Sequence, residues 1–353
     1  MDNLSKIKKI SIKDSATILE ALKLMDSAEK KMLLVFQQDV FTGVLSIGDI
    51  QRAILKGEEF SVRIENILRK KITLGKTSNT ISDIKKEMLD KKIECMPVVN
   101  EKGELVNVHF WEDFFSKEVK RNKESLNCPV VIMAGGKGTR LKPITNIIPK
   151  PLIPIGNKTI IEEIMDCFVG IGCQDYYLSV NYKVETIKHY FDQLKNPNYN
   201  INYFQEPKPL GTAGSMYLLK GKIKKTFFVS NCDILINQDL EDIYNYHKKN
   251  NNAITMVSAL KHFKIPYGTI KTGKKGMFKE MTEKPELTYQ INTGVYILEP
   301  FVLDFIPENT FYHITDLIEN IHERGHNVGV FPISEGSWKD IGQWDEYLKM
   351  IGK

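Results

Sequence analysis

Short apolar runs alternate with amphipathic segments along the C-terminal two thirds of the chain. Runs of strand length occupy residues 129–136, 175–181, 201–206, 226–235 and 253–260. Segments with apolar residues at helical spacing occupy 159–172, 184–194, 212–221 and 239–250. Strands that alternate with helices predict an α/β domain with a largely parallel, doubly wound sheet. In such sheets ligands bind beyond the carboxyl ends of the strands, so the chemistry is expected at that edge.

The N-terminal third has a different pattern, and it is repeated. Residues 10–54 and 72–115 each show a strand, a Ser- or Thr-rich entry, a helix, two further strands and an Asp that opens another helix. The pattern predicts one smaller, pseudo-symmetric α+β domain over residues 1–120. A polar, charged linker over 116–128 separates it from the second domain, 128–353.

Composition narrows the class of protein. Hydrophobic residues make up 42% and charged residues 26% of the chain, as in globular proteins with real cores. No apolar run approaches the roughly 18 residues of a membrane helix, and the basic start lacks an apolar signal region, so we expect a cytoplasmic protein without membrane association. The net charge of +5 is modest and spread out, so no nucleic-acid partner is expected. The five cysteines and seven histidines have no metal-binding spacing, which argues against zinc.

A glycine-rich loop follows the first strand of the second domain. Residues 135–140 read Gly-Gly-Lys-Gly-Thr-Arg, which is neither a Walker A loop nor Gly-x-Gly-x-x-Gly, because Leu141 stands in place of the last glycine. Adjacent glycines let backbone N–H groups face an anion, and Arg140 adds a planar, permanently charged fork for phosphate oxygens. The loop alone is weak support for phosphate binding.

A restrained lysine lies shortly after the loop. Pro149-Lys150-Pro151 predicts a lysine in extended backbone on both sides, because proline fixes its own φ and restricts the preceding residue. The alternative is an ordinary proline-rich connection. Loop, Arg140 and Lys150 together predict a clamp for a polyphosphate.

Gly-Gly-x-Gly-Thr-Arg-Leu followed by Pro-Lys-Pro resembles the signature of sugar-1-phosphate nucleotidyltransferases, over about residues 128–350. The resemblance implies the Rossmann-like fold of that family, a mixed sheet, and Mg²⁺ as cofactor. It implies catalytic roles for Arg140 and Lys150 and metal ligation by Asp233 and Asp340. It also implies nucleotide binding by Gly135, Gly136, Gly138, Thr139, Glu206, Gly211 and Thr212, and sugar-phosphate binding by Glu283, Lys284, Asn292 and Thr293. Read without the resemblance, Asp233 is a helix cap and Glu283-Lys284-Pro285 is a surface tripeptide.

The N-terminal repeat resembles a tandem pair of CBS (cystathionine-β-synthase) domains. In that family a Gly-x-x-Ser/Thr-x-x-Asp segment binds adenine nucleotides, and the first repeat keeps it as Gly43, Ser46 and Asp49. The second repeat keeps Asp113, but Asn107 and Phe110 replace the other two residues, which puts its site in doubt. The alternative is that both aspartates are helix N-caps. Paired CBS domains commonly self-associate, so a homo-oligomer is expected.

The resemblance predicts a reaction in which an NTP and a hexose 1-phosphate give an NDP-sugar and pyrophosphate. Residues 205–214 look more like the guanylyltransferase branch, so GTP and glucosamine- or mannose-1-phosphate are favoured, with UTP, dTTP and CTP as alternatives. The domain arrangement resembles bacterial enzymes that supply nonulosonic (legionaminic) acid biosynthesis. The competing hypothesis is a non-catalytic sensor of sugar nucleotides.

Overall fold

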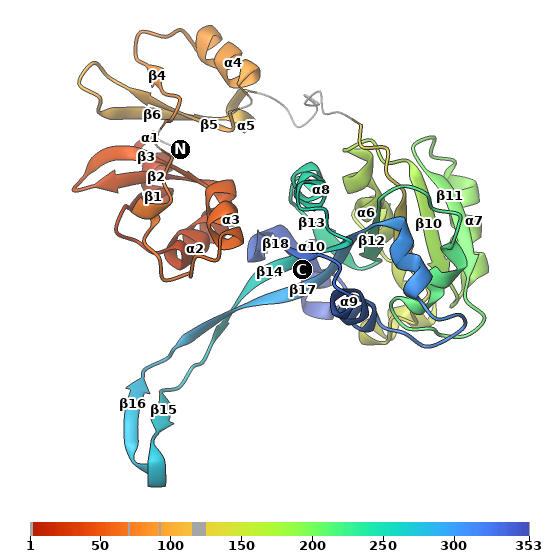
Figure 1. The fold of residues 1–353 in the computed structure, drawn as a ribbon. Helices are drawn as coiled ribbons and strands as arrows, with labels where there is room; N and C mark the ends of the chain where they lie inside the picture. Colours follow the sequence, from red (N-terminus) through yellow and green to blue (C-terminus); the bar gives the residue numbers. More distant parts are fainter. Residues whose placement is uncertain (1–2, 70, 92, 115–124, 353) are drawn as a thin grey trace. The chain divides into compact units, whose positions relative to one another are not determined.

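A computed structural model describes residues 3–69, 71–91, 93–114 and 125–352 (Figure 1). The chain divides into two compact units, with the boundary between residues 123 and 124. Most of the predicted linker, 116–128, lies outside the described residues. No helix in the described ranges has the length and apolar character needed to cross a membrane.

The N-terminal unit contains two halves with the same topology. In each half the first strand runs parallel to the second, which pairs antiparallel with the third, giving the orders β1-β2-β3 and β4-β5-β6. The first half comprises α1 (Asn3–Lys9), β1 (Ser11–Lys13), α2 (Ile18–Ala28), β2 (Met32–Gln37), β3 (Val40–Ser46), α3 (Ile47–Leu55) and the 3₁₀ turn Ile64–Asn66. The second comprises β4 (Gly75–Lys76), α4 (Ile81–Asp90), β5 (Cys95–Val99), β6 (Leu105–Phe110) and α5 (Trp111–Phe114). The repeat predicted from sequence is therefore confirmed as an α+β unit.

Local sequence explains where these helices begin. Thr17, Ser46 and Thr80 each cap a helix, and each accepts a hydrogen bond from the backbone N–H of the third helical residue. An acidic residue at that third position returns a hydrogen bond to the cap, which completes a capping box. The apolar stripe of α2 then packs toward the core of the unit.

The C-terminal unit is built on a seven-stranded sheet with the order β11-β10-β7-β12-β17-β14-β18. Every neighbouring pair is parallel except the two pairs made by β17. Its strands are β7 (Val130–Met133), β10 (Asp175–Val180), β11 (Asn200–Gln205), β12 (Phe227–Asn231), β14 (Ile254–Lys264), β17 (Glu286–Leu298) and β18 (Val328–Ser334). The predicted doubly wound α/β fold with a mixed sheet is confirmed.

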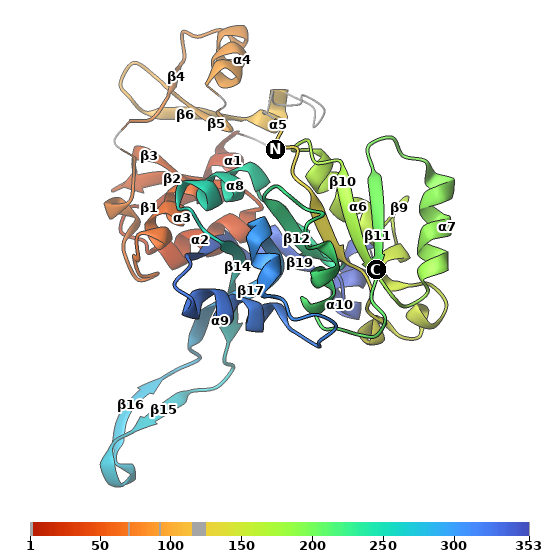
Figure 2. The same ribbon diagram turned by 45° about the vertical axis from the view of Figure 1, so that its right-hand side comes forward.

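Side chains from both faces of this sheet are buried. On β7, Val130 and Ile132 pack on one side with residues of α6 (Ile160–Val169), α7 (Val184–Leu194) and α8 (Leu240–Lys249). Val131 points to the other side, where α9 (Ile314–Glu323) and two 3₁₀ segments, Gly214–Leu219 and Pro300–Phe305, form a second core. Burial on both faces explains the continuous apolar run of this strand, and Figure 2 shows helices on either side of the sheet.

Three two-stranded pairs and a C-terminal helix lie outside the large sheet. The short pairs are β8 (Pro154–Ile155) with β9 (Lys158–Thr159), β13 (Ile234–Ile236) with β19 (Trp338–Asp340), and β15 (Thr269–Thr272) with β16 (Phe278–Thr282). The chain ends with α10 (Trp344–Met350).

Two predicted elements differ from the structure. The helix expected over 212–221 is a 3₁₀ segment that begins at Gly214, because residues 211–213 form a turn held by contacts to a distant segment. The strand expected over 226–235 breaks at Cys232 and Asp233, and its last part pairs with β19 in another sheet. Both differences come from long-range pairing that a local pattern does not contain.

Candidate functional site

The glycine loop and the restrained lysine pack directly against each other. Gly138 has a φ of +63°, and a Cβ placed there would lie 2.9 Å from both Lys150 Cβ and Thr145 Cγ2. The hydroxyl of Thr145 donates a hydrogen bond to Gly138 O at 3.0 Å. Position 138 therefore requires glycine for two reasons: the backbone is left-handed, and a side chain would collide with Lys150 and Thr145.

Lys150 differs in one respect from the sequence expectation. Pro149 is extended, as predicted, but Lys150 begins a single 3₁₀ turn, Lys150–Leu152, rather than continuing the extended backbone. The turn closes with a hydrogen bond from Ile153 N to Lys150 O. The Lys150 side chain is only 10% exposed, so the loop and the turn bury it while its ammonium group reaches a carboxylate.

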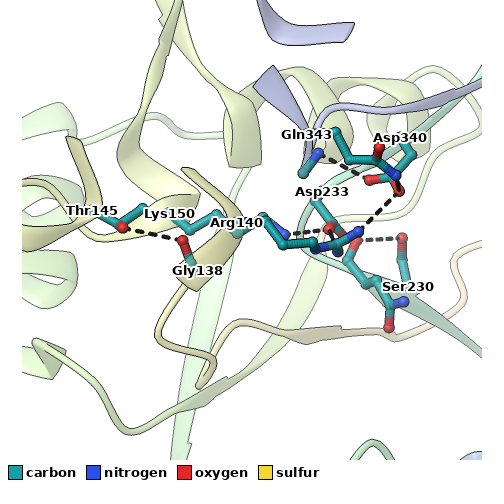
Figure 3. A network of polar contacts seen from close by, with 10 residues as sticks. Gly138, Arg140, Thr145, Lys150, Ser230, Asp233, Asp340 and Gln343 are labelled. Carbon is teal, nitrogen blue, oxygen red and sulfur yellow. Dashed lines mark hydrogen bonds and ion pairs between the residues drawn. The ribbon is translucent and has the colours of Figure 1, made fainter. Parts of the chain in front are cut away.

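Two carboxylates and two cations form one network at this edge of the sheet (Figure 3). Lys150 Nζ pairs with Asp233 Oδ2. The guanidinium of Arg140 contacts Asp233 Oδ2 at 3.3 Å and Asp340 Oδ2 at 3.4 Å, so it bridges the two acids. The four formal charges sum to zero, so each buried charge in the network has an opposite charge beside it.

The two acids come from segments far apart in the sequence. Asp233 lies in the turn between β12 and β13, and Asp340 ends β19. The antiparallel pairing of β13 with β19 sets Asp340 opposite Ile234, and Ile341 N donates to Asp233 O at 2.9 Å. Asp233 is thus not a helix cap: it sits where the strand leaves the main sheet.

Two residues that the sequence analysis missed complete the network. Gly342 N donates to Asp340 Oδ1 at 2.9 Å, and Gln343 Nε2 donates to Asp340 Oδ2 at 3.2 Å. A Cβ at Gly342 would lie within 3 Å of side-chain atoms of Asp233, Lys150 and Asp340. The only signal for this role is a glycine two positions after Asp340, which is uninformative without the fold.

Glu206 lies against the start of the loop. Its Oε2 accepts a hydrogen bond from Leu210 N at 3.0 Å, and a Cβ at Gly135 would lie 2.6 Å from its Oε1. Burial raises the pKa of Glu206 above its ordinary value. Gly136, by contrast, has no heavy atom within 4 Å of an added Cβ, so this part of the loop is open. Thr139 begins the 3₁₀ turn Thr139–Leu141, which carries Arg140 toward the acids.

Residues 210–214 are held by the segment before α9. Gly211 has a φ of +81°, and a Cβ there would lie 2.7 Å from Tyr312 O. Tyr312 O also accepts hydrogen bonds from Ala213 N and Gly214 N, each at 3.0 Å. Thr212 Oγ1 accepts from Ile314 N at 2.9 Å, so this hydroxyl helps to start α9. The structure gives Gly211 and Thr212 these packing roles.

The predicted sugar-phosphate residues separate into two groups. Asn292 and Thr293 lie on β17, next to Gly294. A Cβ at Gly294 would collide with the side-chain amide of Asn231, which ends β12 two residues before Asp233. This part of β17 is therefore near the network. Asn292 Oδ1 accepts from Gly294 N at 3.1 Å. The buried hydroxyl of Thr293 donates to Val257 O at 2.8 Å, which ties it to the sheet.

Glu283 and Lys284 are not brought to the network in this structure. They lie between β16 and β17, and both are exposed. Glu286, where β17 begins, is eight residues from Gly294, a path of about 26 Å at roughly 3.3 Å per residue of strand. The two residues therefore sit at the base of a projecting ribbon, well away from Asp233.

In the N-terminal unit, Asp49 is buried among positive charges. Its Oδ2 accepts hydrogen bonds from Ser46 N at 2.9 Å and from the Ser46 hydroxyl at 2.6 Å. Its Oδ1 pairs with Arg52 and, at 2.6 Å, with Arg69 Nε. Burial alone raises the pKa of Asp49, but the hydrogen bonds from Arg69 and Ser46 outweigh it and hold the pKa below its ordinary value.

The helix-cap alternative is wrong for Asp49. Ser46 is the N-cap of α3, and Asp49 is the third helical residue of its capping box. Asp113 occupies the same place in the second half, as the third residue of α5. Its Oδ2 accepts a hydrogen bond from Phe110 N at 2.9 Å, and its Oδ1 pairs with Lys6 Nζ at 3.2 Å. A ribose hydroxyl could reach Asp49 only if Arg69 moved aside, because both carboxylate oxygens have partners.

Comparison with known proteins identifies the family of the chain. The nucleotidyl transferase family profile matches residues 129–353, and the CBS domain profile matches 64–108. The chain belongs to the nucleotidyl transferase family and carries a CBS domain before that region. The predicted resemblance is thereby confirmed.

Individual relatives share only part of the chain. It is 34% identical over 229 residues to a mannose-1-phosphate guanyltransferase of Yarrowia lipolytica, covering 62% of this chain and 61% of that protein. It is 32% identical over 229 residues to the protein of the same name from Saccharomyces cerevisiae, covering 62% of each. The match therefore spans about three fifths of these curated relatives.

A solved structure shows the fold alone. A Bacillus anthracis protein assigned as a glucose-1-phosphate thymidylyltransferase, in complex with a sucrose, superposes with a TM-score of 0.51 at 18% identity. The superposition covers 64% of this chain and 94% of that chain.

The lowered pKa of Asp49 predicts how acid affects stability. A carboxyl whose folded pKa lies below its unfolded value of 3.8 stabilises the fold above that pH, and the contribution is lost as pH falls through the folded pKa. We expect Asp49→Asn to lower the urea midpoint of the N-terminal unit at pH 7, with the difference from wild type constant above about pH 5 and shrinking below pH 3.8. A difference independent of pH would contradict the assignment.

Proposed function

We propose that the protein transfers a nucleotidyl group from an NTP, with GTP preferred, to a hexose 1-phosphate and releases pyrophosphate. The observation that carries the proposal is the charge network beside the glycine loop, where Lys150 and Arg140 converge on Asp233 and Asp340. Family membership and the two guanyltransferase relatives support the reaction and the base. Glucosamine- or mannose-1-phosphate is the expected acceptor.

The chemistry needs positive charge more than a base. A sugar 1-phosphate is already an anion near neutral pH, so its oxygen attacks the α-phosphorus directly, and the bond to the leaving pyrophosphate breaks. Repulsion between anions is the main barrier, and fixed cations lower it. The loop amides and Arg140 would bind the triphosphate and the departing pyrophosphate. Lys150, buried and held by its turn, would lie near the α-phosphate and the attacking oxygen.

The residues present fit a bound Mg²⁺. Asp233 and Asp340 supply hard oxygen donors close enough for one guanidinium to contact both, and Gly342 leaves space beside them. Mg²⁺ commonly uses one or two carboxylates together with substrate phosphates and waters. When bound, it would neutralise phosphate charge. Arg140 and Lys150, which neutralise these acids in the structure, would then turn to the phosphates.

Glu206 supports the preference for guanine. A carboxylate is an acceptor, and guanine presents two adjacent donor groups, N1–H and N2–H₂, on one edge. Uracil and thymine carry carbonyl oxygens on both sides of a single donor, so a carboxylate there is repelled. The buried Glu206, beside the loop, is suited to this discrimination.

Other parts of the proposal come from the resemblance. An adenine nucleotide at Ser46 and Asp49 would have to displace Arg69 from the carboxylate. Synthesis of precursors for surface glycans containing nonulosonic acid, in the cytoplasm, follows the domain arrangement.

The competing function is a non-catalytic sensor, and one assay separates the two. Pyrophosphate release should be measured for GTP, UTP, dTTP and CTP with glucosamine-, mannose- and glucose-1-phosphate, with Mg²⁺ and with EDTA. We expect release with GTP that requires Mg²⁺. Sugar-nucleotide binding without release from any pair would favour the sensor.

Removing the buried lysine should abolish most turnover. We expect Lys150→Ala to lower kcat by about 10²–10³, the usual effect of deleting a preorganised charge. Lys158→Ala, which removes an exposed lysine paired with Asp166, should leave kcat unchanged. Thermal unfolding of both variants checks that the fold persists, since Asp233 loses a partner. Normal turnover in a folded Lys150→Ala protein would contradict the mechanism.

Neutralising Glu206 should weaken base selection. Glu206→Gln keeps the size of the side chain but replaces one acceptor oxygen with an NH₂ donor, which faces the donor groups of guanine. We therefore expect kcat/KM for GTP to fall by about 10–10²-fold relative to kcat/KM for UTP. The measurement is the ratio of kcat/KM values for the two nucleotides. An unchanged ratio would remove Glu206 from base recognition.

A further inference from the structure

One lysine outside the charge network holds the segment that leads into Lys150. We define this segment, residues 142–149, as the connection, because it joins the glycine loop to the turn of Lys150. The Lys183 ammonium group donates hydrogen bonds to Asn146 O and Ile147 O, each at 2.6 Å. The last carbonyls of a helical turn have no partner within the turn, and a cation beside them is favourable. Lys183 therefore satisfies the carbonyl end of the single 3₁₀ turn in the connection.

The connection has a second contact with the same part of the chain. The Tyr182 hydroxyl donates to Thr145 O at 3.2 Å. The hydroxyl of Thr145 in turn donates to Gly138 O, beside Lys150 (Figure 3). Thr145 is 1% exposed, so packing fixes the early part of the connection. Ile147, three residues before Lys150, is 78% exposed, so its position owes little to packing of its own side chain.

Lys183 stands where local preferences disfavour a lysine. Its φ is +52°, a left-handed backbone that residues other than glycine rarely adopt. It is also the N-cap of α7, where its side chain makes no capping hydrogen bond and a cation opposes the helix dipole. Residues that break local rules in this way commonly serve the tertiary structure or a site. The two hydrogen bonds to the connection compensate these local costs.

The residues just before Lys183 contact two further parts of the same edge. Asn181 Nδ2 donates to Glu206 O at 3.1 Å, and Tyr182 N donates to Gly135 O at 3.5 Å. The short segment between β10 and α7 therefore touches the glycine loop, the backbone of Glu206 and the connection at once.

We propose that Lys183 is a positioning residue for nucleotidyl transfer, because it fixes the connection and thereby the place of Lys150. The inference rests on the proposed function. Lys150 would exchange Asp233 for phosphates during the reaction, so its position then depends on the backbone that carries it. Misplacement of a reacting group by about 1 Å can cost about 10²-fold in rate. Loss of Lys183 should therefore act on kcat more than on KM.

The first test removes the ammonium group and keeps most of the side chain. We expect Lys183→Met to lower kcat at least tenfold, with KM for GTP within about threefold of wild type. Lys183→Arg keeps donors for both carbonyls and should return kcat to within about threefold of wild type. Lys188→Met, on the same helix, removes an exposed lysine that pairs with Glu185 and should leave kcat within about twofold. Thermal unfolding of each variant checks the fold.

A double-mutant cycle separates positioning from a loss of stability. In a Lys150→Ala background, Lys183→Met should change the residual kcat by less than about twofold, because the group that it positions is gone. Equal losses of kcat in the two backgrounds would overturn the proposal. So would a raised KM with unchanged kcat, or normal turnover in a folded Lys183→Met protein.

Hydrogen exchange measures the hold on the connection without any turnover. Ile147 N and Ile148 N both donate to Ile144 O. We expect these two amides to exchange at least fivefold faster in Lys183→Met than in wild type, with exchange in β10 unchanged. If wild type releases no pyrophosphate from any substrate pair, the proposed function fails by itself. Equal exchange in the two proteins would instead overturn the hold of Lys183 on the connection, whether or not wild type is active.

Discussion

The buried ion pair between Lys150 and Asp233 is the constraint on which the C-terminal unit depends. Removing a carboxylate and an ammonium group from water costs several kcal/mol per ion, and the cost is recovered only when the geometry is close and further partners are present. Arg140 supplies the further partner and connects the pair to Asp340. Gly138 and Gly342 keep side chains out of the space around the pair. In the proposed reaction both cations would exchange these carboxylate partners for phosphates.

The sheet gives this pair its position. Because both faces of the sheet are covered, polar groups collect at its carboxyl edge, where strands end. The break after β12 turns Asp233 out of the main sheet, and β19 returns from more than a hundred residues further on to place Asp340 beside it. The same edge holds the glycine loop after β7 and Asn292 at the inner part of β17. Glu283 and Lys284 lie outside this edge, at the base of the projecting ribbon.

The N-terminal unit also contains a buried carboxylate that is paired with cations. Asp49 is buried and ionised because Ser46, Arg52 and Arg69 surround it. Here the cations outnumber the carboxylate, and both arginines are about half exposed. A ligand for Asp49 would therefore have to compete with Arg69. In the second half Asp113 has only Lys6 as an ionic partner among the described residues, so the two halves share a topology but differ in their electrostatics.

Sequence alone determined what depends on near neighbours. Apolar periodicity placed the strands and the long helices, and Ser and Thr caps with acidic third residues began several helices. The glycine loop with Pro149-Lys150-Pro151 marked the segments that supply both cations of the charge network. Tertiary structure decided what depends on residues far apart. Thr212 serves α9, Lys150 begins a 3₁₀ turn, Gly342 lies over the charge network, and Glu283 lies at the base of the projecting ribbon. A local pattern records the backbone preference and burial of its own segment, whereas strand pairing and the balance of buried charge are fixed only when distant segments meet.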